Sequence, residues 1–169
     1  MTITNSTTDD IPEIFSLYQL ATAFQKEKFP TNQWPEFDRD LIGQEVLEKR
    51  QFKLIIDDEV ACIWAITFND ELIWEHRENN ASIYIHRIAT NPKFRGQNLV
   101  QKMVEWAKIF AKKQNRQYLR MDTCGKNERL IQHYETCGFS FLGMNKLQNP
   151  SSLPLHYHGA DVCFFELEL

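Results

Sequence analysis

The amino-acid sequence lacks any apolar run near the ~20 residues that a membrane-spanning helix needs. Its first residues, MTITNSTTDD, contain neither the basic nor the apolar stretch of a secretory leader. The sequence also lacks a CxxC pair and a dense cysteine framework. Its four cysteines are scattered along the chain: Cys62, Cys124, Cys137 and Cys163. We therefore expect reduced thiols, a cytoplasmic location and no membrane partner.

The chain has no excess of basic residues and contains few glycines. Its 19 Lys and Arg residues against 23 Asp and Glu residues give a formal net charge of −4. Surfaces that bind nucleic acids are usually basic, so we expect no nucleic-acid partner. None of the glycines forms a GxGxxG fingerprint or a Walker A GK[ST] sequence, which excludes nucleotide binding of those two kinds.

What the sequence does contain is the composition and periodicity of one α/β domain over residues 1–169. Hydrophobic residues make up 43% and charged residues 25%, as in ordinary globular domains. The pattern predicts a short strand, two helices, a hairpin, a β-α-β-α run and two final strands. The predicted later strands cover 51–56, 59–68, 82–90, 118–123, 139–144 and 160–169, with helices over 99–115 and 127–136. This order is typical of a mixed-sheet α/β domain.

Three local predictions concern segments that precede the strand predicted at 82–90. One of residues 8–10 is expected to cap the first helix, and Asp38 or Asp40 to cap the second. The first helix is expected to bury a stripe formed by Ile14, Leu17, Tyr18, Ala21 and Phe24. The polar segment 69–80 is expected to form a loop.

The segment FRGQNLVQKM, residues 94–103, lies where a strand gives way to a helix. A helix amino terminus with free N–H groups and a favourable dipole binds anions. One glycine at such a place, however, is more often part of a plain connection. The segment alone therefore leaves phosphate binding and a simple turn as alternatives.

Two longer stretches, IHRIATNPKFRGQNLVQKMVEWA and YLRMDTCGKNERLIQHYETCGF, resemble the GNAT superfamily of acyl-CoA-dependent N-acyltransferases. The resemblance covers the order of elements along the whole chain and is sharpest over 82–143. It implies a single-domain GNAT-like α/β fold, in which helices flank a central twisted sheet, mixed and mostly antiparallel. It also implies acetyl-CoA (coenzyme A) as co-substrate, with no metal.

In this family the loop before the helix wraps the coenzyme A pyrophosphate with backbone amides. The matching residues here are Arg95, Gly96, Gln97, Asn98, Leu99 and Val100. Asn98 stands where the family usually has Gly, and Asn tolerates left-handed backbone geometry. Val100 stands where the family has Gly or Ala, and its branched side chain either crowds a diphosphate or points to the core. Ile88, Ala89 and Thr90 match the strand that binds the pantetheine arm.

The resemblance makes Asn127 a coenzyme A contact and Tyr134 both a coenzyme A contact and the general acid that protonates the leaving thiolate. These two residues are seven apart, close to two helical turns, so they share a helix face. A phenol suits this role, since its pKa of ~10 lies near that of a thiol at ~8.5. For the base we name His86, expected to share a strand face with Tyr84 and Ile88. Asp122 and Glu75 remain alternatives.

For the acceptor, the short length and the absence of extra domains favour a primary amine of a small molecule, an amino acid or a peptide over a large assembly. The resemblance places Trp34, with Asn32 and Gln33, on one side of the acceptor site and the final loop, with His156, Tyr157 and His158, on the other. Both segments could instead be surface loops with packed aromatic residues. Tyr84 and Asp122 complete the predicted substrate-binding residues. Pairing of the last strand with a second copy makes a homodimer a further hypothesis.

Three alternatives accompany this interpretation. A metal site could use His156, His158, Asp161 and Cys163, since HxH places two ligands on one side of an extended strand. A Cys-His hydrolase could use Cys124 or Cys137 with His133, although no nucleophile-elbow signature is present. The third alternative is a GNAT-fold module that binds an acyl-CoA or a protein partner without catalysis.

Overall fold

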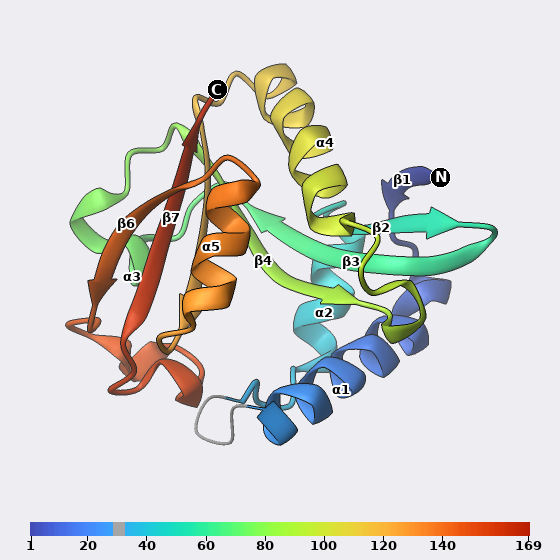
Figure 1. Cartoon of the computed structure of the whole chain (residues 1–169), viewed down its shortest axis with the longest axis horizontal. Coiled ribbons are helices and arrows are strands. Elements are labelled where there is room, and N and C mark those ends of the chain that lie inside the picture. Colours follow the sequence, from blue (N-terminus) through green and yellow to red (C-terminus); the bar gives the residue numbers. More distant parts are fainter. Residues whose placement is uncertain (29–32) are drawn as a thin grey trace. The chain divides into compact units, whose positions relative to one another are not determined.

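The computed structural model describes residues 1–28 and 33–169 (Figure 1). The strands are β1 (Thr2–Asn5), β2 (Gln51–Ile56), β3 (Glu59–Thr67), β4 (Ser82–Thr90), β5 (Tyr118–Cys124), β6 (Ser140–Asn145) and β7 (Val162–Glu168). The helices are α1 (Ile11–Lys28), α2 (Arg39–Leu47), α3 (Glu71–Trp74), α4 (Leu99–Lys113) and α5 (Glu128–Thr136). Short 3-10 turns, η1 to η5, connect several of them. In the described part of the chain, no helix is both long and apolar enough to cross a membrane.

The strands form a seven-stranded sheet in the order β1-β2-β3-β4-β5-β7-β6. β4 and β5 run parallel, with Ser82 opposite Tyr118. The pairs β1–β2, β2–β3, β5–β7 and β6–β7 are antiparallel. The sheet is thus mixed and mostly antiparallel, which confirms the predicted α/β fold class.

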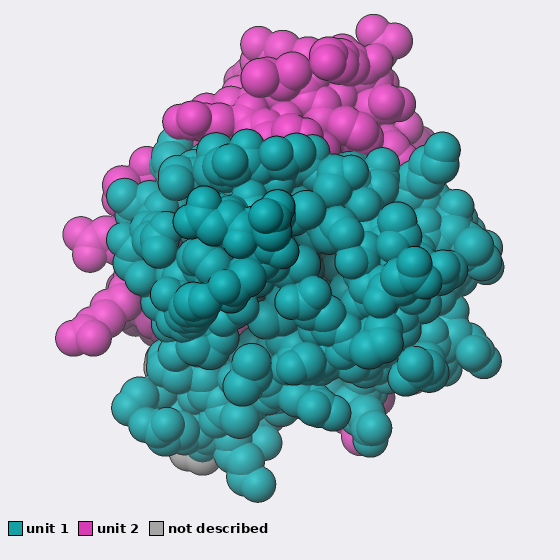
Figure 2. Space-filling model, turned by 90° about the vertical axis from the view of Figure 1, so that its right-hand side faces the viewer, with its two compact units in different colours: residues 1–66, 86–103 teal, residues 67–85, 104–169 magenta. Residues whose placement is uncertain are grey.

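The contacts divide the chain into two compact units, coloured separately in Figure 2. Unit 1 contains residues 1–66 and 86–103, and unit 2 contains residues 67–85 and 104–169. Both β4 and α4 contribute residues to each unit. The prediction of a single domain over the whole chain stays a prediction, and each unit is described by itself.

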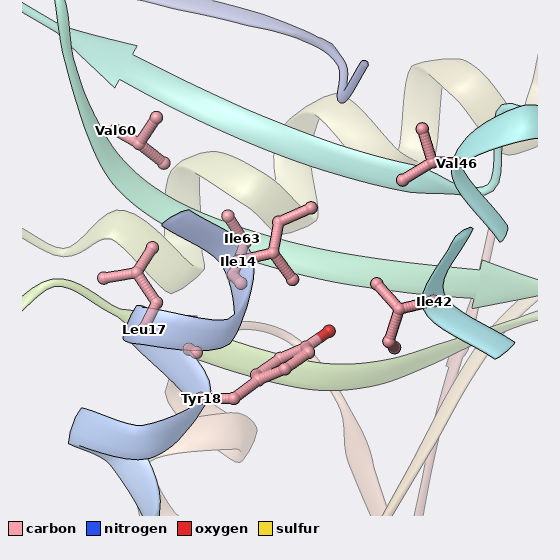
Figure 3. Packing of buried hydrophobic residues seen from close by; sticks show 8 residues of the cluster. Ile14, Leu17, Tyr18, Ile42, Val46, Val60 and Ile63 are labelled. Carbon is pink, nitrogen blue, oxygen red and sulfur yellow. The ribbon is translucent and has the colours of Figure 1, made fainter. Parts of the chain in front are cut away.

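The core of unit 1 lies between α1, α2 and β3 (Figure 3). Its buried side chains are Ile14, Leu17, Tyr18, Ile42, Val46, Val60, Ile63 and Ala89. The first three were predicted from helical spacing. The predicted burial of Phe24 is wrong, because this ring is 39% exposed. The last turns of α1 therefore extend beyond the core that its first turns cover.

The capping predictions were right for α2 and wrong for α1. Asp38 caps α2, since its Oδ1 accepts the N–H of Asp40 at 2.7 Å. At the first helix, the 3-10 turn η1 (Thr8–Asp10) precedes α1 and is capped by Thr7. The Thr7 N–H donates to Asp10 Oδ2 at 2.7 Å, so residues 8–10 lie inside the helical stretch. A bond from the backbone N–H of the N-cap residue to the side chain three residues later is part of the capping-box arrangement. The cap therefore lies one residue earlier than predicted.

The core of unit 2 includes a helix that the sequence prediction missed. Residues 69–80 were predicted as a loop, but α3 and the 3-10 turn η2 (Glu75–Arg77) lie within them. Ile73 and Trp74 of α3 are buried in a cluster with Tyr84, Leu147, Tyr157, Val162 and Phe164. Four residues are too few to show helical periodicity in a sequence. Burial of the Trp74 indole holds this short helix against the core of unit 2.

Candidate active site

The loop before α4 is anchored to β3 at its first residue. The Asn91 N–H donates to the Ala61 carbonyl at 2.9 Å, and Asn91 Nδ2 donates to the Val60 carbonyl at 3.1 Å. Asn91 Oδ1 accepts the N–H of Lys93 at 3.1 Å and so caps the 3-10 turn η3 (Pro92–Phe94). The Phe94 ring is buried. These contacts fix the loop where it leaves the sheet.

Two left-handed residues shape the rest of the loop. Gly96 has φ of +81° and Asn98 has φ of +53°. A Cβ at Gly96 would meet nothing within 4 Å, so this glycine answers a backbone requirement and faces open space. The Asn98 carbonyl accepts the N–H of Lys102 at 3.2 Å, which places Asn98 at the start of α4. Asn98 thus adopts the left-handed backbone conformation that, from the sequence, an asparagine was expected to tolerate here.

The first turn of α4 offers backbone donors at the end of this loop. An α-helix leaves its first N–H groups without intrahelical acceptors, and its dipole favours an anion there. In α4 these include the amides of Leu99 and Val100. The Leu99 side chain is buried, whereas Val100 is only partly buried. The loop therefore combines fixed ends, an open side at Gly96 and helix N–H donors, which is the arrangement that binds phosphate.

Arg95 is held over an aromatic ring. Its guanidinium carbon lies 4.2 Å from the ring centroid of Phe24 in α1. Cation–π contacts of this kind orient an arginine without neutralising it. The exposure of Phe24, unexpected from the sequence, therefore coincides with a contact to the predicted phosphate loop.

The strand that precedes the loop contains an irregularity at Arg87, whose φ is +51°. Alternation of side chains between faces requires extended backbone. The predicted common face of Tyr84, His86 and Ile88 is therefore wrong beyond Arg87. His86 and Ile88 are both partly buried, Ala89 is buried, and the Thr90 hydroxyl lies 3.7 Å from Cys62 Sγ.

In unit 2, α5 carries Asn127 and Tyr134. Asn127 is the N-cap of α5, and its Oδ1 accepts the Leu130 N–H at 3.2 Å. Tyr134 is buried, with its ring edge-on to Phe165 at 5.1 Å and to Phe139 at 6.4 Å. The helix ends before Gly138, whose φ is +99°. The amide NH₂ of Asn127 does not take part in this capping bond.

Of the predicted acceptor residues, Trp34 lies in unit 1. Its ring packs edge-on against Tyr18 and Phe37, with centroid distances of 5.9 and 5.6 Å, and the backbone N–H of Trp34 donates to Gln25 Oε1 at 2.9 Å. Asn32, named with it from the sequence, lies outside the described residues.

Tyr84, predicted to bind substrate, is fully buried in unit 2. Its hydroxyl accepts a hydrogen bond from Arg120 Nη1 at 3.1 Å. Burial and the neighbouring Glu78 carboxylate raise the pKa of Tyr84 to about 12. Direct contact of Tyr84 with an acceptor stays a prediction. Glu75, an alternative base, accepts the Gln148 N–H at 2.8 Å.

Asp122 and His156 lie on elements joined by Tyr157. Asp122 of β5 accepts a hydrogen bond from the Tyr157 hydroxyl at 2.8 Å. His156 precedes Tyr157 in the 3-10 turn η5 (Leu155–Tyr157), with ring centroids 4.3 Å apart. Burial lowers the pKa of His156 to about 4, so its imidazole is neutral at pH 7. Its buried Nδ1 has no hydrogen-bond partner in the described part of the chain.

The structure disagrees with both alternative chemistries. His156 and His158 lie in and after a 3-10 turn, not on an extended strand, and His158 Nε2 contacts the Leu153 carbonyl at 2.9 Å. Burial raises the pKa of Cys124 to about 12 and also raises that of Cys137. A nucleophilic cysteine requires the opposite shift.

Sequence reasoning missed Asn91 and two contacts: the bond from Tyr157, a residue predicted only to line the acceptor site, to Asp122, and the pairing of Glu45 with Arg87. Asn91 had a detectable signal, since Asn before Pro is typical of turn initiation. The two contacts join segments 35 and 42 residues apart. A single sequence contains no local pattern for such pairs.

Comparison with known proteins defines the family. Residues 14–139 match the model of the Acetyltransferase (GNAT) family. The chain belongs to this family. The order of its strands and the helices that flank its sheet are those of the family's fold. The resemblance inferred from the sequence is therefore confirmed.

Individual relatives are distant. YesJ of Bacillus subtilis (strain 168), an uncharacterized N-acetyltransferase, is 28% identical over 74 residues. This match spans 44% of the chain and 41% of that relative, less than half of either. A GNAT acetyltransferase structure from Listeria monocytogenes has a TM-score of 0.74 at 20% identity, covering 99% of this chain and 94% of that one.

Two further structures were solved with ligands. An aminoglycoside acetyltransferase in complex with coenzyme A and kanamycin has a TM-score of 0.72 at 14% identity, covering 99% and 94% of the two chains. A Salmonella typhimurium protein solved with its cofactor acetyl-CoA has a TM-score of 0.70 at 13% identity, covering 100% and 94%. At these identities the likeness is one of fold.

Proposed function

We propose that this protein transfers an acetyl group from acetyl-CoA to a primary amine of a small molecule, an amino acid or a peptide. The observation that carries the proposal is the loop from Arg95 to Val100. It has left-handed turns at Gly96 and Asn98, open space at Gly96 and the amino terminus of α4 at its end. Membership in the acetyltransferase family supports the same assignment.

In the proposed complex, the loop amides bind the pyrophosphate, and Arg95 adds positive charge beside it. The backbone of Ile88, Ala89 and Thr90 binds the pantetheine arm. Asn127 offers its side-chain NH₂ to coenzyme A while its carbonyl oxygen caps α5. Binding of the long cofactor holds the thioester in place, so that transfer becomes a reaction between two fixed groups.

The proposed reaction is direct attack, without an acyl-enzyme. His86 takes a proton from the ammonium form of the acceptor, directly or through water. The free amine nitrogen then bonds to the thioester carbonyl carbon, the carbon–sulfur bond breaks, and the nitrogen loses its second proton to solvent, to which His86 also returns the proton that it took. Tyr134 gives its phenolic proton to the leaving thiolate and recovers one from solvent. The products are the N-acetyl amine, coenzyme A as free thiol and one proton.

For the acceptor, we propose that Trp34 in unit 1 and the loop with His156 and Tyr157 in unit 2 each contribute residues that bind it. Asp122, with its hydrogen bond from Tyr157, offers a carboxylate to an ammonium group. The overall negative charge favours approach of a cationic acceptor. Neutral His156 contributes an aromatic surface without opposing positive charge.

The test has two stages. Titration of acetyl-CoA and coenzyme A into the purified protein by calorimetry should show binding in the micromolar range. Free-thiol release is then followed with a small polyamine, free amino acids and a short peptide. Release that depends on one acceptor class identifies it, and Tyr134→Phe should lower kcat while acetyl-CoA still binds.

A non-catalytic acyl-CoA-binding module is the second candidate, favoured by the departures at Asn98 and Val100. Acetyl-CoA binding without thiol release for any amine class would support it. Turnover by Tyr134→Phe equal to that of the wild type would remove the assigned acid. Absence of coenzyme A binding would contradict both candidates.

A further inference from the structure

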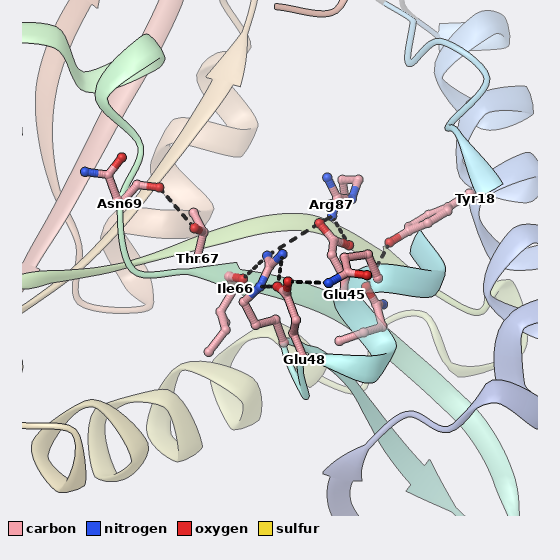
Figure 4. A network of polar contacts seen from close by, with 10 residues as sticks. Tyr18, Glu45, Glu48, Ile66, Thr67, Asn69 and Arg87 are labelled. Atoms are coloured by element: carbon pink, nitrogen blue, oxygen red, sulfur yellow. Dashed lines mark hydrogen bonds and ion pairs between the residues drawn. The ribbon is translucent and has the colours of Figure 1, made fainter. Parts of the chain in front are cut away.

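Arg87 of β4 and Glu45 of α2 form a buried ion pair in unit 1 (Figure 4). Arg87 Nη2 donates to both carboxylate oxygens of Glu45. Glu45 is 4% exposed, and the Arg87 side chain is 17% exposed. The two residues are 42 positions apart in the sequence. The pair therefore ties α2 to β4 at the residue where the strand is irregular.

Other groups surround the pair on several sides. Arg50 Nη1 lies 3.7 Å from Glu45 Oε1, and Arg50 also donates to the Ile66 carbonyl at 3.2 Å. The Arg87 guanidinium carbon is 5.5 Å from the ring centroid of Phe37. Tyr18, whose pKa burial raises, lies beside Arg87, and the interactions with Tyr18 and Glu45 raise the pKa of Arg87 despite its burial. Arg87 is thus a permanent cation with a fixed place.

A need for stability does not explain this arrangement, because the buried ion pair and the left-handed backbone each have a cost in free energy. A buried ion pair loses hydration on both partners and adds little net stability. A left-handed φ is unfavourable for a residue with a long side chain. Both features meet at Arg87, directly before the three strand residues assigned to the pantetheine arm. Strain of this kind is concentrated at functional sites.

The same three residues are fixed at their other end. The Thr90 hydroxyl contacts Cys62, and the N–H and side chain of Asn91 bond to Ala61 and Val60 of β3. A left-handed residue in a strand locally redirects the ladder and re-aims the groups that follow it. Ile88 and Ala89 therefore lie between two anchors, one from Glu45 and one from β3.

We propose that the Glu45–Arg87 pair positions acetyl-CoA: it holds Arg87 in its left-handed conformation and so sets the direction of the peptide groups of Ile88, Ala89 and Thr90. Arg87 and Glu45 are positioning residues, since the backbone that follows them makes the contact. The inference rests on the proposed function, because it explains how the same site is held.

Glu45→Gln tests the proposal, because it keeps the shape of the side chain and removes its charge. Asp10→Asn is the matched control. Asp10 pairs with Lys53 at 2.6 Å, both side chains are about as buried as Arg87, and both lie in unit 1 on other elements. We expect Glu45→Gln to raise the dissociation constant and KM for acetyl-CoA about tenfold, with a smaller change in kcat. Asp10→Asn should leave both constants unchanged while Tm falls for each variant.

Hydrogen exchange gives a readout that needs no ligand. In Glu45→Gln the amides of residues 88–90 should exchange faster, and in Asp10→Asn they should keep the wild-type rate. Arg87→Lys keeps the charge but removes the planar guanidinium that lies 5.5 Å from the ring centroid of Phe37, and serves where Glu45→Gln does not fold. It should weaken acetyl-CoA binding in the same direction.

The outcomes separate this inference from the proposed function. If the wild type and Glu45→Gln bind acetyl-CoA equally well, the positioning role is contradicted and the proposed function stands. If both control and test variants lose affinity in proportion to Tm, the pair is a stability element only. If the wild type binds no acetyl-CoA, the proposed function fails and this inference fails with it.

Discussion

The Tyr157 hydroxyl donates a hydrogen bond to Asp122 Oδ2 at 2.8 Å, and this bond joins η5 to β5 within unit 2. Tyr157 is 9% exposed, and burial together with the Asp122 charge raises its pKa well above the usual value. The phenol therefore stays protonated and remains a donor at neutral pH. One carboxylate of the proposed acceptor site thus has a fixed orientation.

Removal of this hydroxyl should affect the amine more than the cofactor. We expect Tyr157→Phe to raise KM for the amine several-fold, with the acetyl-CoA dissociation constant unchanged. The lost hydrogen bond to a charged group should lower the free energy of unfolding by roughly 1.5–3 kcal/mol. Tyr118→Phe, in β5 of the same unit, is the control. Equal amine KM values for both variants would contradict the role of Tyr157.

The two functions assigned to Asn127 can be separated by two substitutions. Asn127→Asp keeps the oxygen that caps α5 and removes the NH₂, so stability should hold while coenzyme A binding weakens. Asn127→Ala removes both groups and should also lower the free energy of unfolding by about 1 kcal/mol. Thermal unfolding and calorimetry on both variants provide the comparison. An Asn127→Asp protein with wild-type affinity would limit Asn127 to capping.

The contact between Arg95 and Phe24 predicts a small effect on cofactor binding from a residue outside the loop. Loss of a cation–π contact of roughly 0.5–1 kcal/mol corresponds to an affinity change of about two- to five-fold. Phe24→Leu should therefore raise the acetyl-CoA dissociation constant by that factor. Phe15→Leu is the control on the same helix, α1. It removes a ring whose centroid lies 5.4 Å from the guanidinium of Arg39 in α2, and it should leave the acetyl-CoA dissociation constant unchanged. A larger rise in the acetyl-CoA dissociation constant for Phe15→Leu than for Phe24→Leu would contradict a role of Arg95 in phosphate binding.

His156 should contribute to the loss of stability in mild acid. Its pKa is about 4 in the folded protein and 6.5 in its usual range, so between these values the unfolded chain binds a proton that the folded one does not. Stability should therefore fall as pH drops from 6.5 towards 4. His156→Gln should flatten this part of the profile, measured by chemical denaturation at several pH values. Parallel profiles for the two proteins would show that His156 does not titrate in this window.

The sequence was sufficient to predict the backbone where the residue types within a segment determine its local conformation. The turn Asp57-Asp58 was predicted as a hairpin, and both residues have positive φ, as tight hairpin turns require. Asn98 was predicted to tolerate a left-handed conformation and adopts one. Gly138 was predicted to stop α5, and it follows Cys137, the C-cap residue of this helix.

The sequence was insufficient where distant residues decide. Nothing local marks Arg87 as left-handed, because its conformation depends on a carboxylate in α2. Phe24 continues the apolar spacing of α1 but lies beyond the core and meets Arg95 instead. The bond from Tyr157 to Asp122 crosses a long loop that has no periodic pattern. Each miss involves a tertiary contact that overrides or adds to a local preference.

The central claim is that the loop from Arg95 to Val100 binds the pyrophosphate of coenzyme A. Its most direct test is calorimetric titration of acetyl-CoA into the wild type, Gly96→Ala and Gly159→Ala. Both glycines have positive φ, +81° and +73°, and open space where a Cβ would be, but Gly159 lies in the loop before β7. We predict micromolar binding to the wild type and Gly159→Ala, and clearly weaker binding to Gly96→Ala. Equal binding by all three proteins, or by none, would contradict the account.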